Sequence, residues 1–201
     1  MDSHTELANR INDEKDKLDE LMEQIDYEKE TPVVERKITR ITEHIYLSDW
    51  SCAMKADELA EMGIFNVICI ASKNNRKTDN VIKDYARCTI SEKRIHLDDY
   101  TNDQIIDHFD SVYNEIHRCV VGQHKILIYS PKGQSRAPTL VIYYCMRRYI
   151  ELHHKNALLN ALLFVKKKRK SIKPNWGFLK QLIDAEQILK SRNSKKNIRI
   201  Y

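Results

Sequence analysis

The chain has 201 residues, of which 42% are hydrophobic and 31% charged, and its formal net charge is +5. This length favours one domain with a single core and a short extension, and the composition is typical of a soluble globular protein. The longest uncharged apolar stretch, residues 137–146, is roughly half of what a membrane span requires. Since no basic and then apolar stretch follows Met1, we expect neither a membrane segment nor a signal peptide.

The cysteines are odd in number and widely spaced: Cys52, Cys69, Cys88, Cys119 and Cys145. They form no CxxC pair, so the sequence suggests neither a zinc site nor a disulfide framework, and we expect no metal and no cofactor. Unpaired cysteines within apolar runs are typical of buried thiols in a reducing compartment. The expected location is therefore the cytoplasm, the nucleus or both.

Charge is unevenly distributed along the chain. Residues 1–36 contain 12 Asp and Glu against 5 Lys and Arg, whereas residues 37–201 contain 17 Asp and Glu against 29 Lys and Arg. We therefore expect an acidic helical extension (1–36), a basic domain (37–191) and a basic tail (192–201), in which residues 195–199 are expected to be disordered. A basic domain attracts anionic partners at long range, although charge alone does not identify them.

The N-terminal extension is expected to be helical. The segment from Thr5 to Lys29 has no Pro or Gly, and Pro32 follows it, which predicts a helix that ends before this proline. Ile11, Leu18 and Ile25 are spaced seven apart, which is a weak heptad. Three interpretations stay open: a helix docked on its own domain or partly frayed, a partner-binding or dimerising helix, and an anion mimic folded across a basic pocket.

Strands and helices then alternate along the chain. We expect short strands within 38–47, a helix over 54–62 ended by Gly63, an apolar strand over 65–71 and strand-like pieces within 86–97. Helical spacing follows over 105–121, then a strand at 126–128, a helix that Arg136 opens, and helices over 157–170 and 175–190. This alternation predicts an α/β fold with its functional loop at the C-terminal end of a strand.

The most informative segment is residues 129–136, which read Tyr-Ser-Pro-Lys-Gly-Gln-Ser-Arg between a strand and a helix. Backbone N–H groups of a loop at a helix N-terminus, with an arginine folded over them, make a pocket for a phosphate dianion. We therefore predict that phosphate is bound by Ser130, Pro131, Lys132, Gly133, Gln134, Ser135 and Arg136.

This loop resembles the His-Cys-x-x-Gly-x-Ser-Arg-Ser signature of the dual-specificity phosphatases, a branch of the cysteine-dependent protein tyrosine phosphatases. The resemblance spans about residues 38–190 and implies that family's fold, a mixed, mostly parallel sheet flanked by helices, to which the acidic helix is added. Residues 41–48 are similar to its opening strand, and Leu59 with 63–67 to its helix-to-strand step. Its closing helices are matched by residues 165–169, Ile172, Pro174, Asn175, Phe178, Gln181, Leu182 and Glu186.

The resemblance also implies roles for single residues. In the family a thiolate attacks phosphorus, loop N–H groups and an arginine hold the phosphate oxygens, and an aspartate protonates the leaving oxygen. Arg136 matches this arginine, and Gly133 matches a loop glycine that allows close backbone approach. Asp99 matches the acid, with Asp98 as the near alternative. Because the segment around Asp99 is rich in turn-forming residues, a capping or turn role is the simpler expectation.

The chain departs from the family pattern where the chemistry is performed. Ser130 stands in place of the nucleophilic cysteine, and a serine hydroxyl ionises so much less readily than a thiol that we expect it to stay protonated at neutral pH. Tyr129 replaces the family's histidine, and Ala137 replaces a hydroxyl residue that assists breakdown of the covalent intermediate. Pro131 has no N–H, so the loop has one donor fewer.

We therefore expect a pseudophosphatase with no intact catalytic residue. It would bind phosphorylated Ser, Thr or Tyr side chains, or scaffold kinase-pathway proteins, without dephosphorylating them. The alternatives are an active phosphatase with an atypical loop, an engineered cysteine-to-serine trap, and a phosphate- or RNA-binding module, since some relatives of this fold act on RNA 5′ phosphates. The basic run from Lys166 to Lys170 is expected to be a solvated helix face rather than a nucleic-acid patch. The sequence does not predict the oligomeric state.

Overall fold

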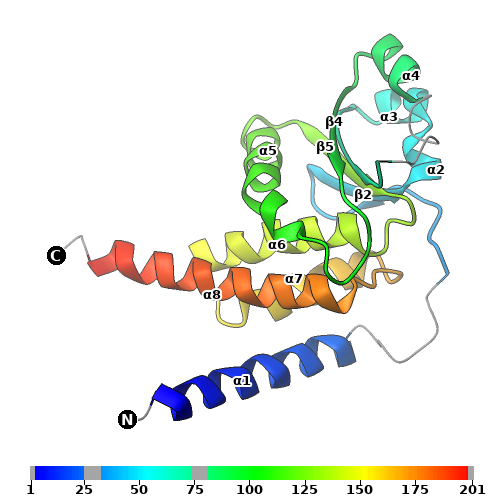
Figure 1. The fold of residues 1–201 in the computed structure, drawn as a ribbon. Helices are drawn as coiled ribbons and strands as arrows, with labels where there is room; N and C mark the ends of the chain where they lie inside the picture. The colour runs from blue at the N-terminus through cyan, green and yellow to red at the C-terminus, as the bar shows by residue number, and fades with distance from the viewer. Residues whose placement is uncertain (1–2, 25–32, 74–80, 199–201) are drawn as a thin grey trace.

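A five-stranded sheet forms the centre of the protein (Figure 1). The computed structural model describes residues 3–24, 33–73 and 81–198. The strands are β1 (Thr39–Arg40), β2 (Ile45–Asp49), β3 (Ile64–Ala71), β4 (Ser91–His96) and β5 (Lys125–Ser130), in the order β1-β2-β5-β3-β4. Only the short β1 pairs antiparallel, with β2, while the other pairings are parallel. The predicted mixed, mostly parallel sheet is confirmed.

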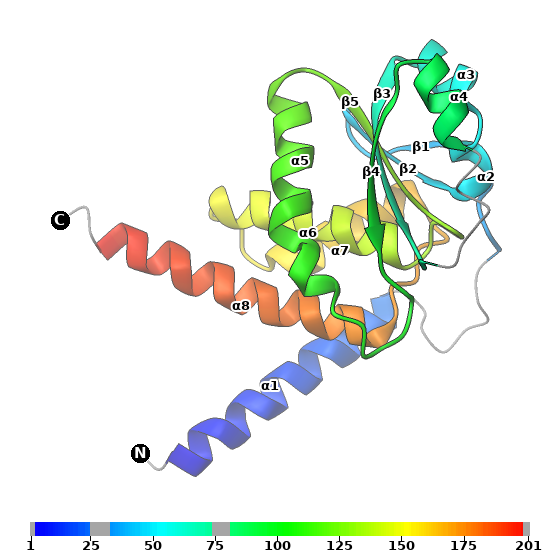
Figure 2. The same cartoon turned by 45° about the horizontal axis from the view of Figure 1, so that its top comes forward.

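Helices cover both faces of this sheet (Figures 1 and 2). One face carries α2 (Trp50–Ala53), α3 (Ala56–Glu61) and α4 (Val81–Arg87). On the other side lie the 3₁₀ helix η2 (Ile105–His108), α5 (Phe109–Val121), α6 (Arg136–Glu151), α7 (Ala157–Lys168), α8 (Trp176–Ile198) and α1 (Ser3–Gln24). Within the part of the chain that the structure describes, no helix is both long and apolar enough to span a membrane.

The central strands are buried on both faces. Ile68 and Ile128 belong to the larger core under α5 to α8, whereas Val67 and Leu127 belong to the smaller core under α2 to α4. Such burial explains why these strands are nearly continuous apolar runs rather than alternating ones. The loop after Ser130 therefore starts at the end of the central strand β5, whose residues are packed on both faces.

The structure corrects several predicted boundaries. The short helix α2 precedes α3 and was not predicted; its start is fixed by Asp49, whose carboxylate accepts the Cys52 N–H. Helix α4 takes up the first residues of the segment 86–97, and only β4 within it is a strand. Helix α8 continues to Ile198, so residues 195–198, which were expected to be disordered, are helical, and the Asn193 amide donates to the Ile150 carbonyl of α6.

The N-terminal helix α1 docks on the domain through α8 and α7. Leu21 is completely buried there, and the Lys17 ammonium pairs with the buried carboxylate of Glu186 on α8. The acidic side chains of Asp16 and Glu20 remain exposed, so the described part of α1 is a docked helix and not an anion mimic in the loop. The end of the predicted helix, including Ile25, lies outside the described residues.

Candidate functional site

The loop of residues 131–135 joins the end of β5 to the first residue of α6. Since β5 lies between β2 and β3 and runs parallel to both, the loop is at the carboxyl edge of the sheet, where α/β folds place their ligands. Gly133 adopts φ +62°, and a Cβ there would lie 2.4 Å from the Ser48 carbonyl oxygen. The close backbone approach expected at Gly133 is confirmed.

Ser130 lies at the base of this loop and is 2% exposed. Its Oγ accepts a long hydrogen bond of 3.5 Å from the Ala137 N–H, and its carbonyl accepts the Gly133 N–H at 3.1 Å. The Gly133 N–H is therefore used within the loop, and Pro131 has none to offer. The loop thus presents fewer backbone donors to an anion than its length suggests.

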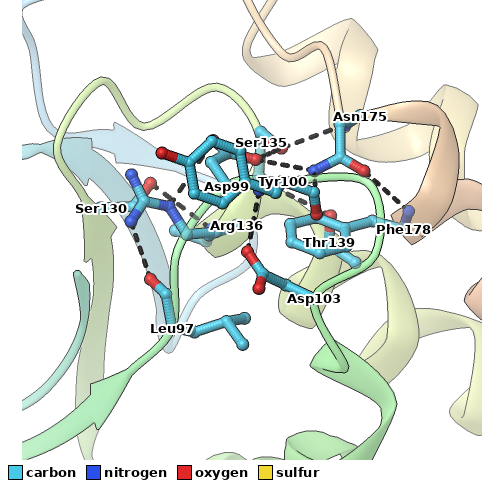
Figure 3. Close-up of polar contacts among 11 residues, drawn as sticks. Leu97, Asp99, Tyr100, Asp103, Ser130, Ser135, Arg136, Thr139, Asn175 and Phe178 are labelled. Carbon is cyan, nitrogen blue, oxygen red and sulfur yellow. Dashed lines mark hydrogen bonds and ion pairs between the residues drawn. The ribbon is translucent and has the colours of Figure 1, made fainter. Parts of the chain in front are cut away.

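Arg136 folds back beside the loop and is 8% exposed. Its Nη1 donates to the Leu97 carbonyl at 2.9 Å, whereas its buried Nε makes no hydrogen bond within the described residues and faces Asp99 Oδ2 in an ion pair at 3.5 Å (Figure 3). Burial lowers the pKa of this guanidinium, and the carboxylates of Asp99 and Asp98 oppose that shift. Because buried N–H donors are seldom left without a hydrogen bond, Nε is the candidate donor of this site to an acceptor such as a phosphate oxygen.

Asp99 connects the loop to the start of α8 (Figure 3). Its Oδ1 accepts hydrogen bonds from the Ser135 hydroxyl at 2.6 Å and from the Asn175 amide at 2.9 Å. Its Oδ2 lies 3.5 Å from Nε of Arg136. The Ser135 Oγ in turn accepts the Asn175 N–H at 3.1 Å. In the part of the chain that the structure describes, the carboxylate of Asp99 accepts from side chains of other segments and not from backbone N–H groups of a turn, and the network brings Asp99, Ser135 and Arg136, three of the predicted site residues, together.

Arg169 supports the loop through a hydrogen bond to its backbone, a role that was not predicted from the sequence. This side chain is completely buried, although the run from Lys166 to Lys170 was expected to be solvated. Its Nε donates to the Gly133 carbonyl at 3.0 Å and its Nη1 to Thr39 Oγ1 at 2.9 Å. Further bonds reach the carbonyls of Lys37 and Glu35. The available signal was its place in the segment that matches the family, a few residues before Pro174.

Tyr129 belongs to the smaller core of the sheet rather than to the loop. Its hydroxyl donates to Glu92 at 2.8 Å, and Glu92 pairs with Arg94 at 2.6 Å. Burial raises the pKa of Tyr129, and the neighbouring Cys69 and Glu92 add to the rise. The phenol is therefore held as a neutral donor, and it is not placed to activate Ser130.

Each of the five cysteines has a pKa raised by burial. The pKa rises to about 11 at Cys52 and at Cys69, to about 12 at Cys145, and upwards also at Cys88 and Cys119. A nucleophilic cysteine needs the opposite shift, because the thiolate is the reactive species. None of these thiols shows the lowered pKa expected of an activated cysteine nucleophile.

Comparison with known families gives one match over most of the chain. Residues 45–188 match the model of the dual specificity phosphatase catalytic domain. Protein 123R of Invertebrate iridescent virus 6, named as a tyrosine phosphatase, is 33% identical over 158 residues, which cover 78% of this chain and 96% of the viral protein. Slingshot of Drosophila melanogaster is 30% identical over 161 residues, covering 80% of this chain but only 14% of that protein phosphatase.

Solved structures share the same architecture. The human tyrosine phosphatase-like serine/threonine/tyrosine-interacting protein superposes with a TM-score of 0.66 and 27% identity, covering 77% of this chain and 98% of its own. Human DUSP28 superposes with a TM-score of 0.64 at 21% identity, covering 80% and 99%. Helix α1 lies wholly outside the matched range of 45–188. The chain therefore belongs to the dual-specificity phosphatase family.

Proposed function

We propose that this protein is a pseudophosphatase, which binds phosphorylated side chains of partner proteins without hydrolysing them. One observation carries the proposal: the loop combines a buried N–H of Arg136, which makes no hydrogen bond and lies 3.5 Å from Asp99 Oδ2, with a hydroxyl, that of Ser130, at its base. The first group suits a phosphate oxygen, because charge-assisted hydrogen bonds to guanidinium groups are strong. The second is a poor nucleophile unless a base removes its proton.

No such base is placed at Ser130. In the described ranges, its Oγ accepts the Ala137 N–H and donates to no carboxylate or imidazole. The Asp99 carboxylate is occupied by Ser135 and Asn175. The loop therefore favours holding phosphate over transferring it.

A similar protein supports this proposal. The human structural neighbour is named as tyrosine phosphatase-like and as interacting with serine, threonine or tyrosine. That name describes a phosphatase-like fold and an interaction, and it does not name a phosphatase activity. We propose that this chain likewise has the phosphatase fold without the activity, with phosphoproteins of a kinase pathway as its expected partners.

Calorimetry with phosphorylated and unphosphorylated peptides tests the proposal, together with turnover of a chromogenic aryl phosphate. We expect phosphate-dependent binding that falls by about tenfold or more in Arg136→Ala, because one charged hydrogen bond contributes about 1.5–3 kcal/mol. Arg118→Ala is the matched control, since Arg118 is exposed near the far end of α5. Turnover that Ser130→Ala abolishes would instead identify an active phosphatase. Binding that is indifferent to Arg136 would refute recognition of phosphate by this loop.

A further inference from the structure

We infer that helix α1 holds the segment around Asp99 in place through α8, and that Lys17 and Leu21 are the positioning residues. The inference rests on the proposed binding of phosphate at the neighbouring loop, and it adds a means of regulation to that site. Helix α1 packs on α8 and α7 and lies outside the family match. Whatever releases α1 from α8 would therefore weaken the phosphate site.

The C-terminal half of α1 makes the contact with the domain. Leu21 is completely buried in the larger core, and Leu18 and Met22 are partly buried against the same core. The Lys17 ammonium pairs with Oε2 of Glu186 on α8. In both views the C-terminal end of α1 lies beside the first turns of α8, while its N-terminal end points away from that helix (Figures 1 and 2).

Glu186 joins α1 to two helices of the domain. Its side chain is 1% exposed, and its Oε1 accepts the Leu158 N–H at the start of α7 at 3.0 Å. The Lys190 ammonium lies 3.2 Å from the same oxygen, but this lysine is half exposed. A buried charge that loses one of its partners is strongly destabilising. Loss of Lys17 should therefore disturb α8 more than loss of an exposed lysine.

The first turns of α8 are bonded to the candidate site. Asn175, directly before the helix, donates its N–H to Ser135 Oγ at 3.1 Å and its amide to Asp99 Oδ1 at 2.9 Å. One turn into the helix, the buried Gln181 donates to the Asp103 carbonyl at 2.8 Å. These bonds connect α8 to the phosphate loop and to both ends of the segment 99–103.

The backbones of α8 and of this segment also touch. A Cβ at Gly177 would lie only 1.8 Å from the Thr101 carbonyl oxygen. A shift of α8 must therefore move the segment after Asp99 or break its hydrogen bonds. Glu186 is 11 residues beyond Asn175, which is about three turns of one helix. Since packed helices move as rigid elements, the contact with α1 at Glu186 supports the contacts at Asn175.

Hydrogen exchange and calorimetry with a phosphotyrosine peptide test the inference on the full chain. Lys17→Met removes the ion pair with Glu186, and Leu21→Ala removes buried apolar contacts. In each variant we expect faster amide exchange in residues 99–106. The affinity for the peptide should fall by about threefold to tenfold, which is an ordinary coupling between distant sites. Lys17→Arg should keep both properties, because the ion pair can form again.

Two control variants make the same kind of change elsewhere. Lys15 is an exposed lysine of α1, so Lys15→Met should change neither exchange nor affinity. Lys125→Met removes a bond of 2.6 Å to the Met62 carbonyl at the amino end of β5. This variant should lower the melting temperature, yet it should leave the affinity and the exchange of residues 99–106 unchanged.

The outcomes distinguish the inference from the proposed function. If exchange in Lys17→Met and Leu21→Ala is faster only within α1 and the affinity is unchanged, the inference is wrong while the proposed function stands. The inference is also wrong if Lys125→Met lowers the affinity as much at an equal loss of melting temperature. If the wild type binds no phosphopeptide, the proposed function fails. The exchange of residues 99–106 then decides alone whether α1 positions this segment.

Discussion

The carboxylate of Asp99 faces the guanidinium of Arg136, with Oδ2 at 3.5 Å from the buried Nε. The pair is too long for a strong hydrogen bond, yet it places a negative charge beside the donor that a phosphate oxygen would need. Asp99 is held there by Ser135 and Asn175. The protein thus keeps its own anion at the edge of the proposed phosphate site.

Asp99→Asn should therefore strengthen phosphate binding. The amide can keep an oxygen toward Ser135, while the negative charge that repels the ligand is removed. We expect the affinity for inorganic phosphate or a phosphopeptide to rise by about twofold to tenfold, given effective dielectric constants near a protein surface. Calorimetry at neutral pH measures the change. Asp110→Asn on α5, which removes an exposed carboxylate paired with Arg147, is the control and should change little; weaker binding in Asp99→Asn would contradict this account.

Arg169→Met should destabilise the fold and distort the loop together. The substitution keeps the apolar stem but leaves the carbonyls of Gly133, Lys37 and Glu35 without their donor. We expect a loss of about 3–5 kcal/mol in the free energy of unfolding, as for other broken buried charge networks, and weaker phosphate binding. Urea unfolding measures the first effect. Lys170→Met, at the exposed neighbouring position, should cost less than about 0.5 kcal/mol, and equal losses for the two variants would refute the assigned role of Arg169.

Much of this fold follows from sequence patterns. The apolar runs of β3 and β5 are visible because both strands are buried on two faces, and the glycine at residue 133 marks the close approach to β2. Other elements depend on contacts that no local pattern contains. Helix α2 starts where the Asp49 side chain caps it, and the end of α8 is held by a bond from Asn193 to α6.

In the candidate site, too, some residues could be predicted from the sequence and others depend on contacts in the folded chain. The loop residues, Arg136 and Asp99 can be found by spacing and resemblance, because each sits at a fixed offset from a strand. Arg169 could not be told apart from the neighbouring lysines, since nothing in a basic run indicates which side chain turns inward. Its burial depends on carbonyls from residues 35, 37 and 133, which only the folded chain brings together.

Glu186 should make stability depend on acid pH. Burial raises the pKa of this carboxyl, but bonds from the Lys17 ammonium and the Leu158 N–H outweigh burial, so the folded pKa lies below its ordinary value. A lowered pKa in the folded state adds stability above the unfolded pKa of about 4.3, and this stability is lost as the pH falls through the folded value.

Glu186→Gln should therefore lower stability at neutral pH by about 1–3 kcal/mol and flatten the decline below about pH 4.5. Urea midpoints measured across that range provide the test. Glu58→Gln is the control, since Glu58 forms only an exposed ion pair with Lys55. If stability falls in acid as steeply in Glu186→Gln as in the wild type, other carboxylates cause this loss of stability.

On the proposed function, catalysis should require several changes at once. Ser130→Cys supplies a thiol at the base of the loop, and Ala137→Ser supplies the hydroxyl found in active relatives, as the family pattern implies. Tyr129→His supplies the remaining family residue, but it breaks the bond to Glu92 and should cost about 1–2 kcal/mol in stability. We expect weak aryl phosphate turnover in Ser130→Cys and about tenfold to a hundredfold more in the triple variant, since positioned proton-transfer groups contribute factors of this size or larger.

Two further variants identify the cause of the turnover, or of its absence, in the triple variant. Arg136→Ala in the triple background should abolish turnover, which shows that the activity belongs to this loop. If the folded triple variant stays inert, Pro131→Ala should be added, because it can restore the missing N–H donor while the Gly133 turn stays in place. Activity that appears only then would assign the loss of catalysis to the backbone of the loop as well as to its side chains. An inert quadruple variant would contradict the view that Ser130, Tyr129, Ala137 and Pro131 together account for it.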